Sequence, residues 1–187
     1  MGGGDKPLLR LGAHSLLEHA IAQIRPQVTA MVLNANGDPA RFAAIGLPVI
    51  ADPLPDFPGP LAGILAGLRY AAKHHPGIAH VASIPTDTPF LPSDLVARLR
   101  ATAPLAVACS GGRTHPVIGL WPVALADDLE AALRAGDRKI DRWTARHGVV
   151  QVPFASDPVD PFFNVNTPDD LAEAARLIAL YPNLCCP

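Results

Sequence analysis

The feature that most restricts the fold of this 187-residue chain is a regular alternation of helical and extended segments from end to end. Residues 60–74 begin with Pro in the first turn and predict a helix, and the apolar run 81–84 that follows predicts a buried strand. Alternation of this kind is typical of an α/β protein, in which helices cover the faces of a sheet. We therefore expect an α/β fold with one domain over residues 1–180 and a disordered tail over residues 181–187.

The same reasoning places the remaining elements. Ser15 and Glu18 form a capping-box pattern that predicts the start of a helix, and Thr167 followed by Pro168 predicts the start of another. We expect further helices at 15–24, 39–46, 92–101, 126–135, 141–147 and 168–180, and strands at 30–33, 48–51, 105–109, 115–120 and 149–152.

Composition argues against several classes of function. The formal net charge is -2 and no block of lysine or arginine stands out, which disfavours a nucleic-acid-binding surface. No run of about eighteen apolar residues predicts a membrane span, and no secretory signal is visible. The three cysteines form no CxxC pair, so we expect no zinc site and a cytoplasmic location.

The chain opens on a glycine run that ends in a lysine, Gly2-Gly3-Gly4-Asp5-Lys6. Bare backbone N–H groups of such a run can surround phosphates, and the Lys6 ammonium can act as a point charge on them. No Ser or Thr follows the lysine, so this is not a Walker sequence. The alternative is an unstructured start.

Asp87 is the strongest single candidate for a metal-binding residue. It follows the apolar run 81–84 at the carboxyl end of an expected strand, where open α/β sheets bind their ligands. Mg²⁺ is held by one or two carboxylates together with phosphate oxygens and water, so a single aspartate is sufficient. The alternative is a turn or N-cap aspartate ahead of the helix at 92–101.

Polar residues also follow other expected strands. Asn34 and Asn36 share one face if the strand period of two persists, and Asp52 ends the next strand. Amide and carboxylate groups can recognise a base or a ribose through hydrogen bonds. The Asp52 carboxylate, for example, could accept hydrogen bonds from N1–H and the 2-amino group of guanine. Asn164 and Asn166 repeat the alternating arrangement ahead of a capped helix. Ordinary turns are the alternative at each position.

The remaining positive charge lies in two turn-like segments. Arg113 and His115 belong to one, and Arg138 and Lys139 to the other. These side chains could hold the phosphate of a second substrate, or they could be solvated turn residues, and the sequence leaves their roles open.

Taken in order, these motifs resemble the molybdenum cofactor guanylyltransferases. The resemblance runs from Gly2 to about Leu180; each motif is weak alone, but the series is specific. It rests on Gly-Gly-Asp-Lys-Pro-Leu-Leu at 3–9, Asn34-Ala35-Asn36, Asp52, Gly-Pro-Leu-Ala-Gly-Ile at 59–64, Asp87-Thr88-Pro89, His115-Pro116 and Asn-Val-Asn-Thr-Pro at 164–168.

The resemblance implies a three-layer Rossmann-like nucleotidyltransferase with a mostly parallel sheet. It also implies transfer of GMP from GTP to the phosphate of molybdopterin cofactor, with release of pyrophosphate and use of Mg²⁺. Lys6 and Asp87 would be catalytic, with Asp87 also on the metal. Nucleotide or cofactor binding would fall to Gly3, Gly4, Lys6, Asn34, Asp52, Asp87, Asn164 and Asn166. Molybdoenzymes or their chaperones are possible protein partners.

Members of that family usually carry a short strand, Leu-Ala-Gly-Gly and Arg-Met ahead of the Gly-Gly-Asp-Lys motif. This sequence starts at that Met, so we expect the first strand and half of the phosphate loop to be missing, and a mis-assigned start codon is our favoured explanation. If the shortened chain is the natural product, we expect weak GTP binding, low stability and little activity.

Two other functions remain open from the sequence. The same fold could use CTP, or another nucleotide with a sugar phosphate. Alternatively, the chain could be a non-catalytic protein that binds molybdopterin or the enzymes that accept it.

Overall fold

The computed structural model describes residues 6–54, 59–137 and 139–185 of the chain. Its strands are β1 (Arg10–Leu11), β2 (His14–Ser15), β3 (Leu33–Asn34), β4 (Val49–Ile50), β5 (His80–Ser83), β6 (Ala106–Ser110), β7 (Arg113–Pro122) and β8 (Val150–Phe154). Its α-helices are α1 (Leu16–Ile24), α2 (Pro60–His74), α3 (Leu95–Thr102), α4 (Ala126–Arg134), α5 (Ile140–Arg146) and α6 (Pro168–Leu180). Short 3-10 helices lie at Lys6–Leu8, Arg25–Gln27, Pro39–Ile45, Val123–Leu125 and Pro182–Cys185.

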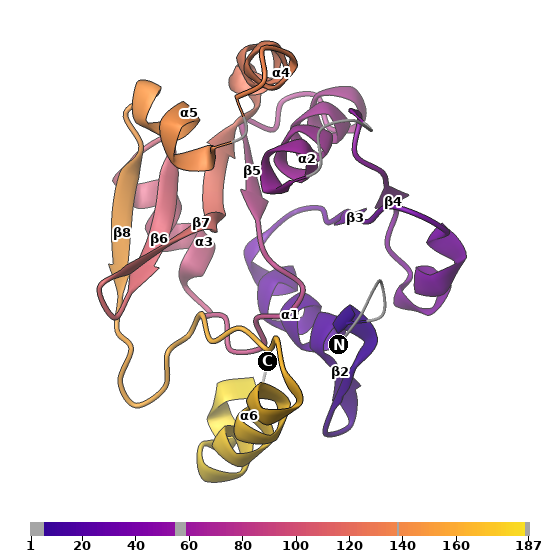
Figure 1. Cartoon of the computed structure of the whole chain (residues 1–187), viewed down its shortest axis with the longest axis vertical. Coiled ribbons are helices and arrows are strands. Elements are labelled where there is room, and N and C mark those ends of the chain that lie inside the picture. Colours follow the sequence, from indigo (N-terminus) through magenta and orange to yellow (C-terminus); the bar gives the residue numbers. More distant parts are fainter. Residues whose placement is uncertain (1–5, 55–58, 138, 186–187) are drawn as a thin grey trace.

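The predicted α/β fold is confirmed, and the sheet is mixed. Four strands form it in the order β5-β7-β6-β8, with β8 parallel to β6 and β7 antiparallel to both of its neighbours (Figure 1). The direction of β7 follows from the turn before it, because two residues, Gly111 and Gly112, can join only antiparallel strands. The expectation of a mostly parallel sheet is therefore corrected at this strand.

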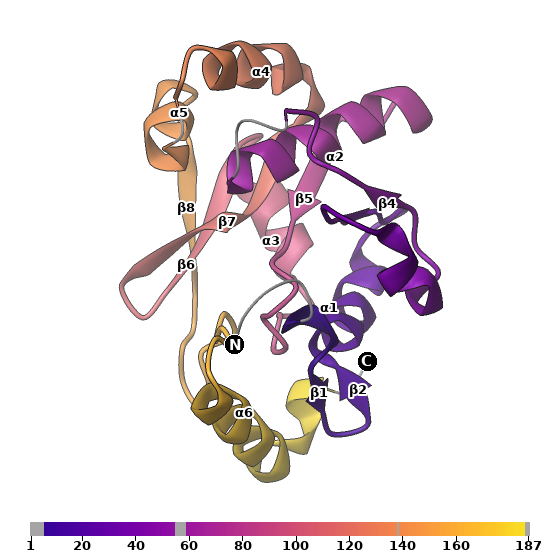
Figure 2. The same cartoon turned by 45° about the vertical axis from the view of Figure 1, so that its right-hand side comes forward.

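Helices cover both faces of the sheet and make three layers. Alternate residues of β6 point to opposite faces, as the strand period requires. Val107 packs with α2, α4, α5 and the buried Trp121 on one face. Ala106 and Ala108 pack with α1 and α3 on the other. Figure 2 shows α4 and α5 above the sheet and α1 beside its lower end.

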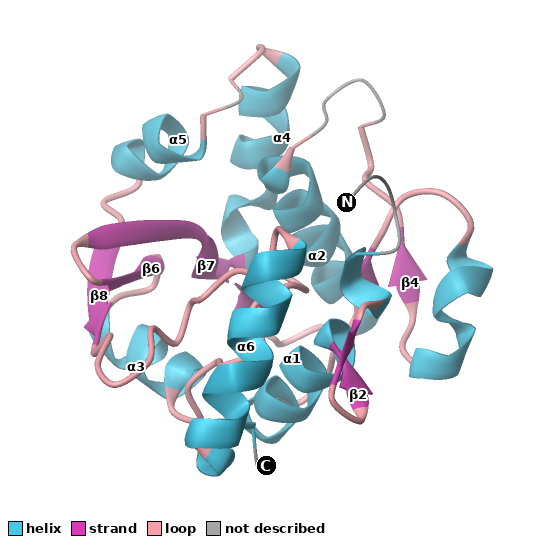
Figure 3. Ribbon diagram, turned by 60° about the horizontal axis from the view of Figure 1, so that its bottom comes forward, coloured by secondary structure: helices cyan, strands magenta, loops and turns pink. Residues whose placement is uncertain are grey.

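The C-terminal helix forms a separate third cluster at one end of the molecule. Ala174 and Leu177 of α6 pack against Leu11 and Leu16, which belong to β1 and the start of α1. Figure 3 shows α6 next to α1. Thr167 caps α6 by accepting from the backbone N–H of Asp170, as the Thr-Pro pattern predicted. The predicted disorder of 181–187 stays a prediction; within that range Pro182–Cys185 is described as a 3-10 helix.

Among the described residues, β3 and β4 form a parallel pair that does not join the four-stranded sheet. The α2 helix gives the relative direction of the two units. Its first turns lie beside the carboxyl ends of β3 and β4, since a Cβ on Gly63 would meet Asn34, whereas Gly67 lies against Val81 near the start of β5. The helix therefore returns the chain antiparallel to both, so β3, β4 and β5 run in the same direction.

A cavity of about 460 Å³ lies between β3 and β5. Its walls come from α1, α2, the segment 27–33 and β5, and most of its lining is apolar.

Candidate active site

Asp87 lies in the loop that leaves the carboxyl end of β5. The backbone carbonyl of Asp87 accepts a hydrogen bond from the N–H of Val165 at 3.0 Å, which ties this loop to the segment ahead of α6. The carboxylate is 18% exposed, so it is partly desolvated and still open to a ligand. The sequence analysis expected Asp87 at this place, after the strand that includes residues 81–84, and its binding of a metal stays a prediction.

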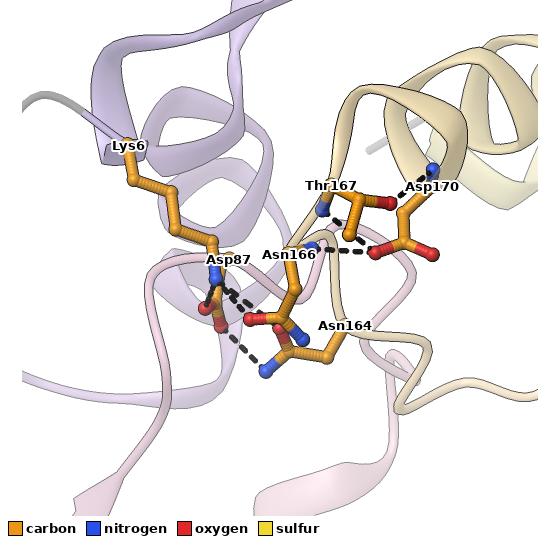
Figure 4. Close-up of polar contacts among 6 residues, drawn as sticks. All are labelled: Lys6, Asp87, Asn164, Asn166, Thr167 and Asp170. Atoms are coloured by element: carbon orange, nitrogen blue, oxygen red, sulfur yellow. Dashed lines mark hydrogen bonds and ion pairs between the residues drawn. The ribbon is translucent and has the colours of Figure 1, made fainter. Parts of the chain in front are cut away.

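Lys6 reaches the same point from the N-terminal 3-10 helix. Its ammonium donates to Asp87 Oδ2 at 2.5 Å and to Asn166 Oδ1 at 2.6 Å, and Asn164 Oδ1 lies 3.4 Å away (Figure 4). Three oxygens from two distant segments therefore surround one positive charge.

The two asparagines are held by the way α6 begins. Asn164 donates from Nδ2 to Asp87 Oδ1 at 2.9 Å, and the backbone N–H groups of Asn166 and Thr167 both donate to Asp170 Oδ2 at 2.8 Å (Figure 4). These backbone hydrogen bonds lower the pKa of Asp170, the bond from Asn166 being the largest cause. Val165 between the asparagines is fully buried, so the alternation predicted from the sequence places both amides on one exposed face.

The donor set around the Lys6 ammonium fits a hard divalent cation. A carboxylate oxygen and two amide oxygens are ligands of the kind that Mg²⁺ takes, with phosphate and water completing its shell. The ammonium itself shows that the arrangement stabilises a cation. Within the described ranges, no group of three or more His, Cys, Asp and Glu side chains could hold a metal ion.

A second polar cluster forms at the carboxyl ends of β3 and β4. Asn34 and Asn36 both donate to the Asp52 carboxylate, at 3.0 and 2.7 Å, and the Asp52 backbone N–H donates back to Asn36 Oδ1 at 2.9 Å. Asn34 and Asn36 are exposed, and Asp52 is half-buried. Because β3, β4 and β5 run in one direction, this cluster and Asp87 follow carboxyl ends at the same edge of the fold, where α/β proteins bind ligands.

Gly63 makes room for this second cluster. A Cβ at that position would lie 2.4 Å from Asn34 Oδ1, far inside the closest contact that real side chains make. The helix α2 can therefore approach Asn34 and Asp52 only because this residue is glycine. The side chain that this glycine approaches is Asn34.

A third group near this edge involves residues that sequence reasoning missed. Ser110, at the end of β6, donates to Asp160 Oδ1 at 2.7 Å and lies 2.8 Å from His115 Nε2. Asp160 Oδ1 also accepts from the backbone N–H of Phe162, so the group fixes the start of the loop that carries Asn164. Burial lowers the pKa of His115. No local pattern marked Ser110 or Asp160.

Several predicted residues remain untested. Gly3, Gly4 and Arg138 lie outside the described residues, and the side chains of Arg113 and Lys139 are exposed. Over the described part of the chain, no helix is both long enough and apolar enough to cross a bilayer.

Comparison with known proteins gives one consistent family. A family model described as a MobA-like NTP transferase domain matches residues 1–152. A molybdenum cofactor guanylyltransferase of Nitrobacter hamburgensis is 55% identical over 186 residues, covering 96% of this chain and 89% of that protein. A protein of the same name from Rhodopseudomonas palustris is 57% identical, covering 95% of this chain and 87% of that protein.

A solved structure shows the same fold. The crystal structure of molybdopterin-guanine dinucleotide biosynthesis protein A from Archaeoglobus fulgidus aligns with a TM-score of 0.69. The alignment covers 95% of this chain and 92% of that one at 23% identity.

Proposed function

The chain belongs to the molybdenum cofactor guanylyltransferases, and from this we propose that it transfers GMP from GTP to the phosphate of molybdopterin cofactor. The observation that carries the proposal is the cluster of Lys6, Asp87, Asn164 and Asn166, which gathers one cation and three oxygen ligands at the carboxyl edge of the fold. A nucleotidyltransferase needs such a place for a triphosphate and its metal.

In the proposed reaction, an anionic phosphate oxygen of molybdopterin attacks the α-phosphorus of GTP. One P–O bond forms there, the bond from the α-phosphorus to the bridging oxygen breaks, and pyrophosphate leaves with the electron pair. The attacking oxygen already carries negative charge, so no side chain has to remove a proton. The protein's task is to bring two anionic groups into line and to neutralise their charge.

We assign these tasks to specific side chains. Asp87 would bind Mg²⁺, with the amide oxygens of Asn164 and Asn166 beside it, and the metal would supply charge neutralisation for the phosphates. The Lys6 ammonium would then contact the phosphates in place of its present carboxylate partner. Loss of its short bond to Asp87 would be offset by the new anionic partner.

The cluster of Asn34, Asn36 and Asp52 is the proposed site for the nucleoside. Each oxygen of the Asp52 carboxylate already accepts one amide hydrogen and retains a lone pair. A carboxylate with this remaining capacity can accept from both N1–H and the 2-amino group of guanine, which cytosine cannot offer in that arrangement. This is the feature that favours GTP over CTP.

The test is a competition of substrates on the purified natural polypeptide that contains this sequence. GTP or CTP is supplied with molybdopterin or with a sugar phosphate, in the presence of Mg²⁺, and both pyrophosphate and the dinucleotide product are measured. We expect product from GTP with molybdopterin, and Asp52→Asn should narrow the preference for GTP over CTP. Equal use of CTP, or no product from a folded protein, would overturn the proposal. Partnership with molybdoenzymes or their chaperones, the cytoplasmic location and the domain limits 1–180 stay predictions.

A further inference from the structure

The Lys6 ammonium contacts the same oxygens that were assigned above to the metal. It donates to Asp87 Oδ2 at 2.5 Å and to Asn166 Oδ1 at 2.6 Å, and Asn164 Oδ1 lies 3.4 Å away (Figure 4). An ammonium and Mg²⁺ both bind through such oxygens, and two cations that share their ligands repel each other. A side chain of the protein therefore competes with a metal ion for these three ligands.

The charges of the cluster are balanced while Lys6 keeps this position. Of the carboxylates that the structure describes, only Asp87 contacts the ammonium. The side chains of Lys6 and Asp87 are 25% and 18% exposed, so bulk water and salt screen the pair only in part. One positive and one negative charge at this distance leave little net attraction for a divalent cation. Free metal ions should therefore bind weakly to the protein alone.

Only the side chain of Lys6 has to move for a metal to bind. The backbone carbonyl of Lys6 accepts a hydrogen bond from the N–H of Leu9 at 3.1 Å, and Leu9 packs against the core cluster that contains α6. The ammonium stands at the end of a flexible four-carbon stem, so it can leave Asp87 while the backbone stays in place. Because a partly buried charge is costly without a partner, the ammonium needs another anion to turn to.

We propose that Lys6 makes the site selective for a divalent metal that arrives together with a nucleotide. The phosphates of GTP would give the ammonium a new anionic partner and would give the metal further oxygen ligands. Metal and nucleotide then each raise the affinity of the protein for the other, as linkage requires. The inference rests on one part of the proposed function, namely that the oxygens around Asp87 bind the metal.

The test measures metal binding without nucleotide and without molybdopterin. Mn²⁺ is titrated into the natural polypeptide that contains this sequence, and the EPR signal of free Mn²⁺ gives the Kd. Lys6→Met removes the charge and keeps the length of the side chain, so it should bind Mn²⁺ about tenfold or more tightly than the parent. Lys73→Met is the matched control, since Lys73 is an exposed lysine in the last turn of α2, and it should leave the Kd unchanged.

Two further variants locate the ion and guard against misfolding. Asp87→Asn, added to Lys6→Met, should abolish the gain in Mn²⁺ affinity, because it removes the one charged ligand of the cluster. Lys6→Gln is also neutral but keeps a hydrogen-bond donor near Asp87, and it should show a similar gain. It replaces Lys6→Met in the comparison if thermal melting shows that the methionine variant is unfolded.

A Kd in the neutral variants that equals or exceeds that of the parent would overturn the proposal. It would mean that the ammonium gathers the three oxygens rather than competing for them. A gain that survives Asp87→Asn would overturn it as well, since the ion would then bind elsewhere. Transfer of GMP by the parent, together with an unchanged metal affinity of Lys6→Met, would refute this inference alone. Tighter Mn²⁺ binding by Lys6→Met, in a protein that does not transfer GMP, would refute the proposed reaction and support the role of Lys6.

Discussion

Replacement of Asp87 by asparagine is the most informative single change in this protein. The substitution keeps the shape of the side chain and removes one negative charge from a carboxylate that contacts Lys6 at 2.5 Å and Asn164 at 2.9 Å. Two unit charges 4 Å apart interact by about 4 kcal/mol at an effective dielectric constant of 20, and a divalent ion doubles that attraction before desolvation is subtracted. A net loss of about 4 kcal/mol in transition-state stabilisation corresponds to about a thousandfold fall in kcat/KM.

The assay is Mg²⁺-dependent release of pyrophosphate from GTP with molybdopterin as acceptor, followed over a range of metal concentrations. The stability of Asp87→Asn should change by no more than about 2 kcal/mol, because the asparagine can still accept a hydrogen bond from Lys6. Asp127→Asn is the matched control, since Asp127 is 89% exposed and pairs with Arg69 at the start of α4. Such a pair contributes about 1 kcal/mol or less, so the control should keep its activity. If Asp87→Asn retains kcat/KM within tenfold of the parent with an unchanged metal requirement, the assignment of Asp87 is wrong.

Three further changes test other parts of the account. Gly63→Ala should raise the KM for GTP about tenfold or more by displacing Asn34, whereas Gly67→Ala, whose new Cβ would lie 3.3 Å from a valine methyl group, should leave that KM nearly unchanged. Ser110→Ala should weaken activation by Mg²⁺ several-fold with little effect on GTP affinity, because it releases the loop that carries Asn164 and Asn166. An equal loss of Mg²⁺ activation and GTP affinity would instead indicate general unfolding. Burial lowers the pKa of His115, so the unfolded chain binds a proton at this residue more readily than the folded chain does. The free energy of unfolding should therefore be fully maintained above about pH 6.5 and should fall as the pH drops below that value. In His115→Gln the free energy of unfolding should fall less steeply with decreasing pH. An NMR titration of the His115 ring with a midpoint at or above 6.5 would contradict this.

Sequence reasoning was most successful where local chemistry sets the structure. The first residues of α2 and α6 were predicted correctly, because a proline at the first helical position and the Thr167 cap define where each helix starts. Strand limits shifted by one to three residues, since a strand ends where its partner ends and not at a local signal.

In the candidate site too, the sequence predicted single residues better than it predicted contacts between distant ones. Lys6, Asp87 and Asn166 were each identified from their own motif, but 81 and 160 residues separate Lys6 from the partners that its ammonium contacts. Only the fold could show that they share one point. Ser110 and Asp160 were missed because a buried polar contact between distant residues leaves no periodic pattern in the chain.

The most direct test of the central claim locates the metal. Mn²⁺, used as a paramagnetic substitute for Mg²⁺, is added to the natural polypeptide together with a non-hydrolysable GTP analogue, and the loss of NMR signal is mapped onto the sequence. We predict that the side-chain amides of Asn164 and Asn166 and the backbone amides around Asp87 broaden first, and that Asp87→Asn restores their signals. Broadening centred elsewhere, such as on the exposed carboxylates of α4, or broadening that Asp87→Asn leaves intact, would contradict the account.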